Sequence, residues 1–228
     1  MTRVSNLGAG QADASSIPAD RARLKEHKER AADDASAMLA EGIVAHVGIA
    51  DADGPVVIPM TYHFDPATPG EIYLHGAHHS RLMQAVASGE RVCVTVTMVD
   101  ALVYSKSGFN HSVNYRSVVV LGEATPVDDR DEKMAALEAL TERLLPGRWA
   151  DVRSPNAKEL KATAILRMPL DEISAKVRTG PPEDDEADYS LDVWAGVIPL
   201  ELVASEPQAD PRLATDAGPP VWAPGKRA

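Results

Sequence analysis

The chain has 228 residues, with 23 Lys and Arg against 34 Asp and Glu, which gives a formal net charge of -11 at pH 7. This length suits one folded domain with extensions, and the negative charge argues against nucleic acid or an anionic membrane as a partner. No apolar run reaches the ~20 residues that cross a bilayer, and the N-terminus lacks the apolar core of a signal peptide, so we expect a cytoplasmic protein.

The composition of both ends differs from that of the middle. Residues 1–19 are small and polar, and residues 204–228 are rich in proline and alanine. Neither stretch can bury much apolar surface. We therefore expect a flexible N-terminal tail over 1–19, a folded domain over 20–203, and a C-terminal tail over 204–228.

Hydrophobic periodicity predicts the elements of the domain. Apolar residues at helical spacing indicate helices over 20–40, 80–89 and 128–147. Short β-rich runs separated by turn signals such as "DADG" and "DPATPG" indicate hairpin-linked strands. These runs cover 43–50, 55–64, 71–76, 91–98, 101–107, about 115–125, 162–170, 172–177 and 193–203. The pattern is typical of an α+β protein with an antiparallel β-barrel core, because closure removes unpaired strand edges.

The run "IYLHGAHHSRLMQAV" contains three histidines, His75, His78 and His79. They lack the i,i+4 helical spacing of a zinc site, and the single Cys93 cannot anchor a cysteine cluster, so no metal site is expected. Ser80 and Arg81 stand where a helix begins, where free N–H groups, a hydroxyl and a guanidinium can bind an anion. A plain N-cap serine beside a surface arginine remains the alternative.

Two further polar clusters follow along the chain. The run "SKSGFNHSVNYRSVVVLGEA" places Arg116 and Ser117 before an apolar strand. In "SAKVRTGPPEDDEADY", Lys176 and Arg178 alternate along a strand and therefore share one face. They are either part of a binding site or one side of an exposed, salt-bridged turn with the acidic run that follows.

These phrases, together with "GPVVIPMTYHF" and "VWAGVIPL", make the chain resemble the pyridoxamine 5′-phosphate oxidase-like, FMN-binding split-barrel family over about residues 20–203. Within that family it is most similar to the flavin-nucleotide-binding branch related to nitroimidazole-resistance reductases. The resemblance implies an α+β fold with a six-stranded antiparallel split β-barrel and peripheral helices. It also implies a homodimer that binds FMN at the subunit interface.

The resemblance assigns roles to particular residues. The strand from Val57 to Tyr62 would run beside the isoalloxazine ring, and His75, Ser80 and Arg81 would bind the phosphate end. Arg116 and Ser117 would lie near the flavin, and Trp194 would reach the cofactor of the partner subunit. The candidate cofactor-binding residues are therefore Val57, Ile58, Pro59, Met60, Tyr62, His75, Ser80, Arg81, Leu82, Arg116, Ser117, Lys176, Arg178 and Trp194.

Two departures from the family pattern bear on activity. Leu82 stands where the oxidases commonly have a lysine at the phosphate, and "WAG" replaces their late Trp-x-Arg pattern. We therefore expect a flavin-dependent oxidoreductase that acts on a small organic acceptor, not a true pyridoxamine phosphate oxidase. The alternatives are a non-enzymatic flavin-binding protein, or the same barrel with haem or a deazaflavin.

Overall fold

The computed structural model describes residues 28–214 and 218–219, with side chains described from Asp34 onward. The predicted N-terminal tail and the first part of the helix expected over 20–40 lie outside the described residues. So does most of the stretch from residue 215 to the end.

The described residues form nine strands, so the expected number of six is not confirmed. All strand pairs are antiparallel, and the order in the sheet is β6-β7-β3-β2-β1-β4-β5-β8, with β9 paired to β4. The strands are β1 (Val44–Asp51), β2 (Gly54–Phe64), β3 (Glu71–Ala77), β4 (Val92–Tyr104), β5 (Ser112–Gly122), β6 (Thr125–Pro126), β7 (Thr163–Pro169), β8 (Glu172–Arg178) and β9 (Gly196–Pro199).

The sequence predicted two strands, 91–98 and 101–107, where the structure has one. The ladder between β4 and β5 shifts its register between Val99 and Ala101, which leaves Asp100 as the extra residue of a bulge. A bulge accommodates one unpaired residue without ending the strand. Strand β4 therefore continues through Asp100, although the alternation of apolar and polar residues in the sequence is interrupted there.

The helices are α1 (Lys28–Glu41), α2 (Arg81–Ala87), α3 (Arg130–Leu144) and α4 (Ala157–Ala162), with short 3-10 turns η2 (Trp149–Asp151) and η3 (Glu186–Ser190). The sequence predicted the first three helices and missed α4. Asn156 and Glu159 form a reciprocal capping box at the start of α4, and this box stabilises a helix of only six residues.

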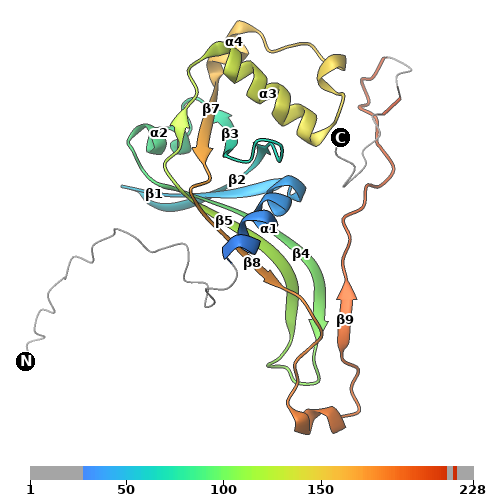
Figure 1. Ribbon diagram of the computed structural model, residues 1–228. Helices are drawn as coiled ribbons and strands as arrows, with labels where there is room; N and C mark the ends of the chain where they lie inside the picture. The colour runs from blue at the N-terminus through green and yellow to red at the C-terminus, as the bar shows by residue number, and fades with distance from the viewer. Residues whose placement is uncertain (1–27, 215–217, 220–228) are drawn as a thin grey trace, which may run out of the picture.

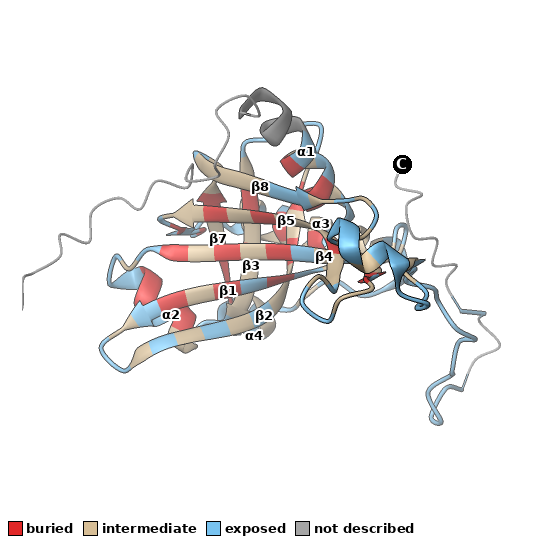
Figure 2. Ribbon diagram, turned by 90° about the horizontal axis from the view of Figure 1, so that it is seen from below, coloured by how far each residue is buried: buried red, intermediate tan, exposed pale blue. Residues whose placement is uncertain are grey.

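The core lies inside the curled sheet (Figure 2). Before the bulge, the even-numbered residues of β4 point inward, where Val94 and Val96 lie opposite Val120 and Val118 of β5. Odd-numbered residues such as Thr95 and Thr97 point outward, because successive side chains of a strand alternate between faces. The sheet thus has a packed inner face and a more polar outer face.

The hairpin of β4 and β5 extends beyond the body of the molecule as an arm (Figure 1). The outer part of β4 pairs with β9, from Ala101 opposite Pro199 to Tyr104 opposite Gly196. The turn η3 lies at the free end of the arm (Figure 1). The arm therefore holds segments that are about ninety residues apart in the sequence.

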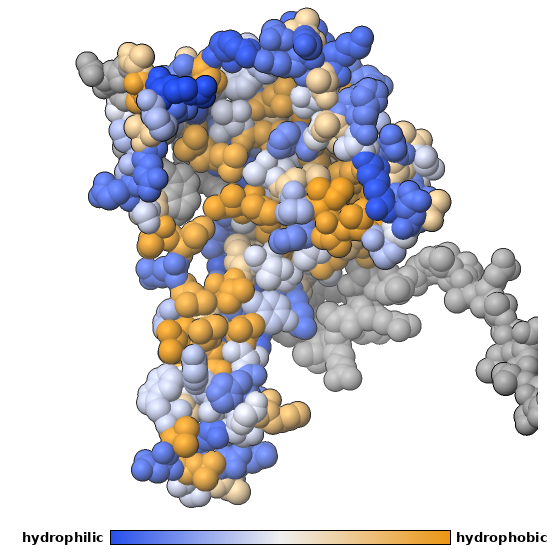
Figure 3. Space-filling view, turned by 180° about the vertical axis from the view of Figure 1, so that it is seen from behind, coloured by the Kyte–Doolittle hydropathy of each residue, from blue (hydrophilic) through white to orange (hydrophobic). Residues whose placement is uncertain are grey.

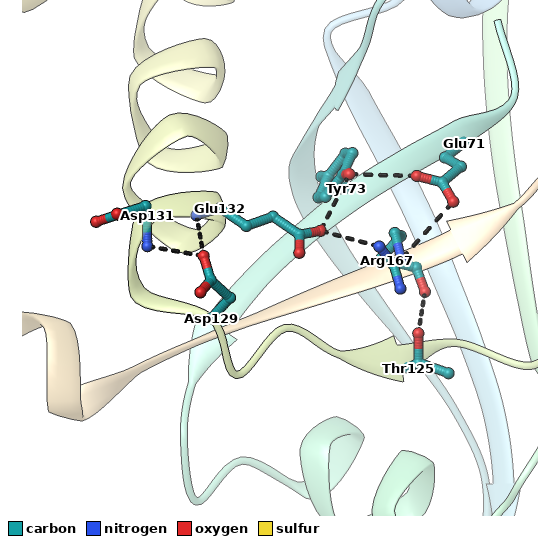
Figure 4. A network of polar contacts seen from close by, with 7 residues as sticks. All are labelled: Glu71, Tyr73, Thr125, Asp129, Asp131, Glu132 and Arg167. Atoms are coloured by element: carbon teal, nitrogen blue, oxygen red, sulfur yellow. Dashed lines mark hydrogen bonds and ion pairs between the residues drawn. The ribbon is translucent and has the colours of Figure 1, made fainter.

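Helix α3 covers β3 and β7 on the side opposite the main core, and polar contacts fix it there (Figure 4). Glu132 of α3 accepts hydrogen bonds from Arg167 of β7 at 3.1 Å and from the Tyr73 hydroxyl of β3 at 3.3 Å. Beneath these contacts Leu140 and Ile165 form a second, smaller apolar cluster.

The end of α1 is tied to β2 and α3 at one point. The Tyr62 hydroxyl lies 2.8 Å from the Leu39 carbonyl oxygen and 3.1 Å from that of Gly42. Arg143 of α3 donates to the same two carbonyl groups at 2.5 Å, and its guanidinium lies 4.3 Å from the centre of the Tyr62 ring. Gly42 has no room for a side chain here, because a Cβ would overlap Val96 and lie 2.8 Å from the Tyr62 hydroxyl.

We predict that Gly42→Ala destabilises the protein, since overpacking a filled core costs about 1–3 kcal/mol. The free energy of unfolding in urea measures this cost. Gly70→Ala is the matched control, because a Cβ at Gly70 meets no atom within 4 Å. Equal stability of the two variants would contradict the packing described at Gly42.

Candidate functional site

The predicted phosphate ligand Arg81 begins α2, directly after the N-cap Ser80. Its guanidinium binds Asp51 through Nε at 2.7 Å and Nη2 at 2.5 Å, and Nη2 also donates to the Gly54 carbonyl at 2.7 Å. The hydrogen bond from Arg81 is the main cause that lowers the pKa of Asp51. The charge of Arg81 is therefore already compensated by Asp51. Of the three guanidinium nitrogens, Nη1 makes no hydrogen bond to the described residues.

The predicted site residue Arg116 is compensated more fully. Its guanidinium contacts Asp100 of the bulge at 2.7 Å and Glu41 at the end of α1 at 2.5 Å. The hydrogen bonds that Arg116 donates to Glu41, and then those to Asp100, raise the pKa of Arg116. Two carboxylates bind this one guanidinium, so its charge is not available to an external anion.

Lys176 and Arg178 of β8 differ from these two arginines. Neither has a carboxylate within ion-pair distance among the described residues. The Lys176 ammonium lies 5.6 Å from the centre of the Tyr115 ring, and Arg178 donates to the Asn114 side chain at 2.6 Å. The salt-bridged turn that was the alternative for these residues is not formed.

The acidic run that follows β8 has another role. Asp184 accepts hydrogen bonds from the backbone N–H groups of Lys106 and Ser107 at 3.0 and 3.2 Å. These bonds join the loop after β8 to the end of the arm. The acidic run thus supports the arm instead of neutralising Lys176 and Arg178.

The two cations belong to a polar patch on the outer face of β4, β5 and β8. Lys176 is opposite Ser117, and Arg178 is opposite Tyr115. The Ser117 hydroxyl lies 2.9 Å from that of Thr97 on β4. We call this set the outer-face patch: Thr95, Thr97, Tyr115, Ser117, Ser174, Lys176 and Arg178.

Sequence reasoning identified Tyr115, Ser117, Lys176 and Arg178 but not the hydroxyl groups of Thr95, Thr97 and Ser174. The available signal was the alternation of these three residues with more buried ones along two strands. The registers that bring them together, with Thr97 opposite Ser117 and Ser117 opposite Lys176, join positions 20 and 59 residues apart. Periodicity within one strand does not give such registers.

The residues predicted beside the flavin ring divide between the two faces of β2. Val57 is 62% exposed and Pro59 is also exposed on the outer face. Ile58 and Met60 pack against the core from the other side. Tyr62 is fully buried and Leu82 of α2 is nearly so, so the side chains of these last two are part of the core and only their main chains remain for a ligand.

The histidines do not converge. His75 lies opposite Ile165, on the side that α3 covers, and burial lowers its pKa. His78 and His79 are exposed in the turn before α2, with ring centres 5.0 Å apart. The described residues contain no group of three side chains that could hold a metal ion.

Trp194 lies on the arm, where 62% of it is exposed. Its ring packs at a tilt against Tyr104 with 5.9 Å between centres. A Cβ at Gly196 would lie 2.8 Å from this ring, so the glycine of "WAG" allows the tryptophan to rest on the main chain. The position that is arginine in the oxidase pattern has no space for a side chain.

Comparison with known proteins assigns the family. Residues 31–177 match the family model described as pyridoxamine 5′-phosphate oxidase. The chain therefore belongs to this family, and its curled antiparallel sheet is the split barrel of that family. No curated protein matches the chain.

Solved structures include two relatives that align with most of the chain. The flavocytochrome Anf3 from Azotobacter vinelandii is 37% identical, with a TM-score of 0.76, over 82% of this chain and 86% of that one. The FAD and heme binding protein from Mycobacterium smegmatis is 32% identical, with a TM-score of 0.75, over 85% and 91% of the two chains. A protein from Bacteroides thetaiotaomicron described as a 5-nitroimidazole antibiotic resistance protein shares the fold, at 20% identity and a TM-score of 0.52, over 66% and 83%.

The described helices include none with the length and apolar character needed to span a membrane.

The two half-buried histidines His63 and His75 make stability depend on pH. Burial is the main cause that lowers the pKa of each, and the nearby charge of Arg143 adds to the effect on His63. In the unfolded chain both titrate near about 6.5. Below that pH the unfolded state binds more protons than the folded state, so the stability present above it is lost as the pH falls.

We therefore predict a lower free energy of unfolding at about pH 5.5 than at about pH 7.5, by at most about 1.4 kcal/mol per histidine, because pH 5.5 lies only about one unit below the pKa of the unfolded chain. Urea titrations of wild type and of a His63→Gln, His75→Gln double variant measure the difference. The double variant should lose much of the dependence, whereas His79→Gln should keep it. An unchanged dependence in the double variant would contradict this origin.

Proposed function

We propose that the chain is a flavin-dependent oxidoreductase whose cofactor phosphate is bound at the outer-face patch. One observation carries the proposal. The basic side chains on the strands are Arg116, Arg167, Lys176 and Arg178, and carboxylates bind the first two. Lys176 and Arg178 keep their charge available for an external anion, beside the hydroxyl groups of Ser117 and Thr97.

The remaining outer face suits a flat, apolar ring. Val57 and Pro59 expose apolar surface on β2, and β1 joins this strand to β4, since His46 is opposite both Pro59 and Thr95. A ring lying near β2 with its phosphate toward β8 would use apolar contacts at one end and charge-assisted hydrogen bonds at the other. Arg81 and Ser80 would add a further contact through the free Nη1.

FMN is the flavin that the sequence resemblance implies, and the name of the Mycobacterium smegmatis relative includes FAD. The two flavins share the isoalloxazine ring and the phosphate next to the ribityl chain. The outer-face patch would bind the phosphate next to the ribityl chain, which both flavins have. The choice between them depends on whether the site also holds an adenylate.

A bound flavin supplies hydride-transfer and electron-transfer chemistry. The chain needs no nucleophile for this and contributes orientation, charge and exclusion of water. We propose a nicotinamide donor and a small organic acceptor as substrates. Pyridoxamine phosphate is disfavoured as a substrate, because Leu82 is in the core and Gly196 has no space for an arginine.

The proposed functional unit is a homodimer. The arm stands apart from the body (Figure 1), and hydrophobic residues run along it (Figure 3). Large apolar side chains there are exposed in the single chain, namely Val99, Val177, Ile198 and Leu200. Apolar surface of this extent marks an interface, and a second copy packed on it would also enclose the outer face and bring Trp194 of one subunit to the flavin of the other.

The names of the two similar structures, a flavocytochrome and a FAD and heme binding protein, favour a second candidate function. In this form the chain would bind haem in addition to the flavin, at a separate position.

We predict that the purified protein carries the absorption bands of an oxidised flavin, and that a nicotinamide donor bleaches them without oxygen. Denaturation should release about one flavin per chain, and phosphodiesterase treatment of the released flavin distinguishes FAD from FMN. A chain that binds flavin but is not reduced would be a flavin-binding protein without this activity. A colourless protein that does not quench the fluorescence of added FMN or FAD would overturn the proposal.

We predict that Lys176→Ala and Arg178→Ala each weaken flavin binding by about 1.5–3 kcal/mol, the range for hydrogen bonds to charged groups. Flavin fluorescence titration measures the affinity. Lys158→Ala is the matched control, because Lys158 is exposed on α4 and away from the sheet's outer face. Arg81→Ala should have the smaller effect, and the reverse order would place the phosphate at the start of α2.

A further inference from the structure

Aromatic residues gather at the free end of the arm. The chain has only two Phe, three Trp and five Tyr, yet Tyr104, Phe109 and Trp194 all lie there together with His111. The Tyr104 ring centre is 5.7 Å from that of His111 and 5.9 Å from that of Trp194. Phe109 is 94% exposed and Trp194 62%. We call these four residues the tip cluster.

The tip cluster is held in place by long-range contacts. The Lys106 ammonium donates to the carbonyl groups of Leu191 and Val193 at 2.6 and 2.7 Å. Asp184 binds the main chain of the same loop. Exposed aromatic surface on a support of this kind is typical of a binding site, because surfaces without a partner seldom keep large rings in water.

The imidazole of His111 is oriented for metal ligation. Its Nδ1 lies 2.9 Å from the Ser107 carbonyl oxygen. A carbonyl group only accepts, so Nδ1 carries the proton and Nε2 carries the free lone pair. A backbone carbonyl that fixes the tautomer in this way is the usual outer partner of a metal-binding histidine, and His111 itself is exposed.

We propose that the tip cluster binds haem, with Nε2 of His111 as an axial ligand of the iron. Tyr104, Phe109 and Trp194 supply apolar surface for the porphyrin. A histidine ligand is common for haem iron, and the surrounding polarity tunes the iron. This inference rests on the second candidate function, in which the chain binds haem in addition to flavin. It assigns His111 as the ligand of the haem iron.

The other described histidines fit this role less well. His63 and His75 are half-buried on the side that α3 covers, and the Nδ1 atoms of both are buried. His78 and His79 have only each other as ring neighbours in the turn before α2. His46 lies on the outer face between Pro59 and Thr95, where the flavin is proposed to bind.

The position of the tip cluster has a consequence for the dimer. Trp194 is the residue proposed to reach the flavin of the partner subunit, and Tyr104 links it to His111. A haem held by His111 would therefore lie at the same interface as that flavin.

The test is a hemin titration of the full-length protein, followed through the Soret band and the electron paramagnetic resonance spectrum. Wild type should bind about one hemin per chain and show the signature of histidine ligation. His111→Ala should bind hemin at least about tenfold more weakly, since even loss of an outer-shell partner costs that much. Added imidazole should restore the spectrum of this variant.

His78→Ala and His79→Ala are the matched controls and should keep the wild-type Soret band. Flavin content is measured in every variant and should stay unchanged in His111→Ala. If wild type binds no hemin while flavin is present, the inference and the second candidate function fail but the flavin function stands. If His111→Ala keeps the wild-type affinity and spectrum, only the assignment of His111 is overturned.

Discussion

The pairing of charges decides which part of this molecule can bind an anion. Acidic side chains outnumber basic ones by 34 to 23. Most arginines and lysines can therefore find a carboxylate partner, and a basic side chain stays available for an external anion only where the fold keeps carboxylates away from it. Asp51 neutralises Arg81, and Glu41 with Asp100 neutralises Arg116. The acidic loop after β8 instead turns toward the arm, where Asp184 binds backbone N–H groups. That turn leaves Lys176 and Arg178 without carboxylate partners, and the proposed site depends on it.

The inside of the split barrel holds the core that stabilises the fold, whereas the outer face and the arm are the surfaces proposed for binding. The inner face of the sheet, with Tyr62 and the valines of β4 and β5, forms the closed core. Apolar residues of the outer face and of the arm are exposed in the single chain. The proposed second copy would cover both. The bulge at Asp100 lets β4 continue into the arm and also supplies a carboxylate that anchors Arg116, so one irregular residue connects the barrel to the part that reaches outward.

Much of the fold followed from the sequence, because periodicity is a local property. The runs that became β1, β2, β3, β7 and β8, and the helices α1, α2 and α3, were predicted close to their observed positions. The bulge that merges two runs into β4, the short β6 and the helix α4 were missed, since each depends on a neighbour far along the chain or on a cap. The site followed less well. Arg81 and Arg116 stood in a suggestive sequence context, yet their partners Asp51 and Asp100 come from other strands, and no pattern within one segment shows that a charge is compensated. Tyr62 and Leu82 were expected beside the cofactor, although the alternation of β2 directs the Tyr62 side chain into the core and the apolar face of α2 does the same for Leu82.

The central claim is that a flavin phosphate lies against Lys176. Lysine acetylation followed by mass spectrometry tests it directly, because the reagent reads the accessibility of each ammonium in the same sample. With saturating flavin, Lys176 should react much more slowly than in the flavin-free protein. The exposed lysines of α4, Lys158 and Lys161, should react at the same rate in both states. Equal reaction of Lys176 with and without bound flavin would contradict the account.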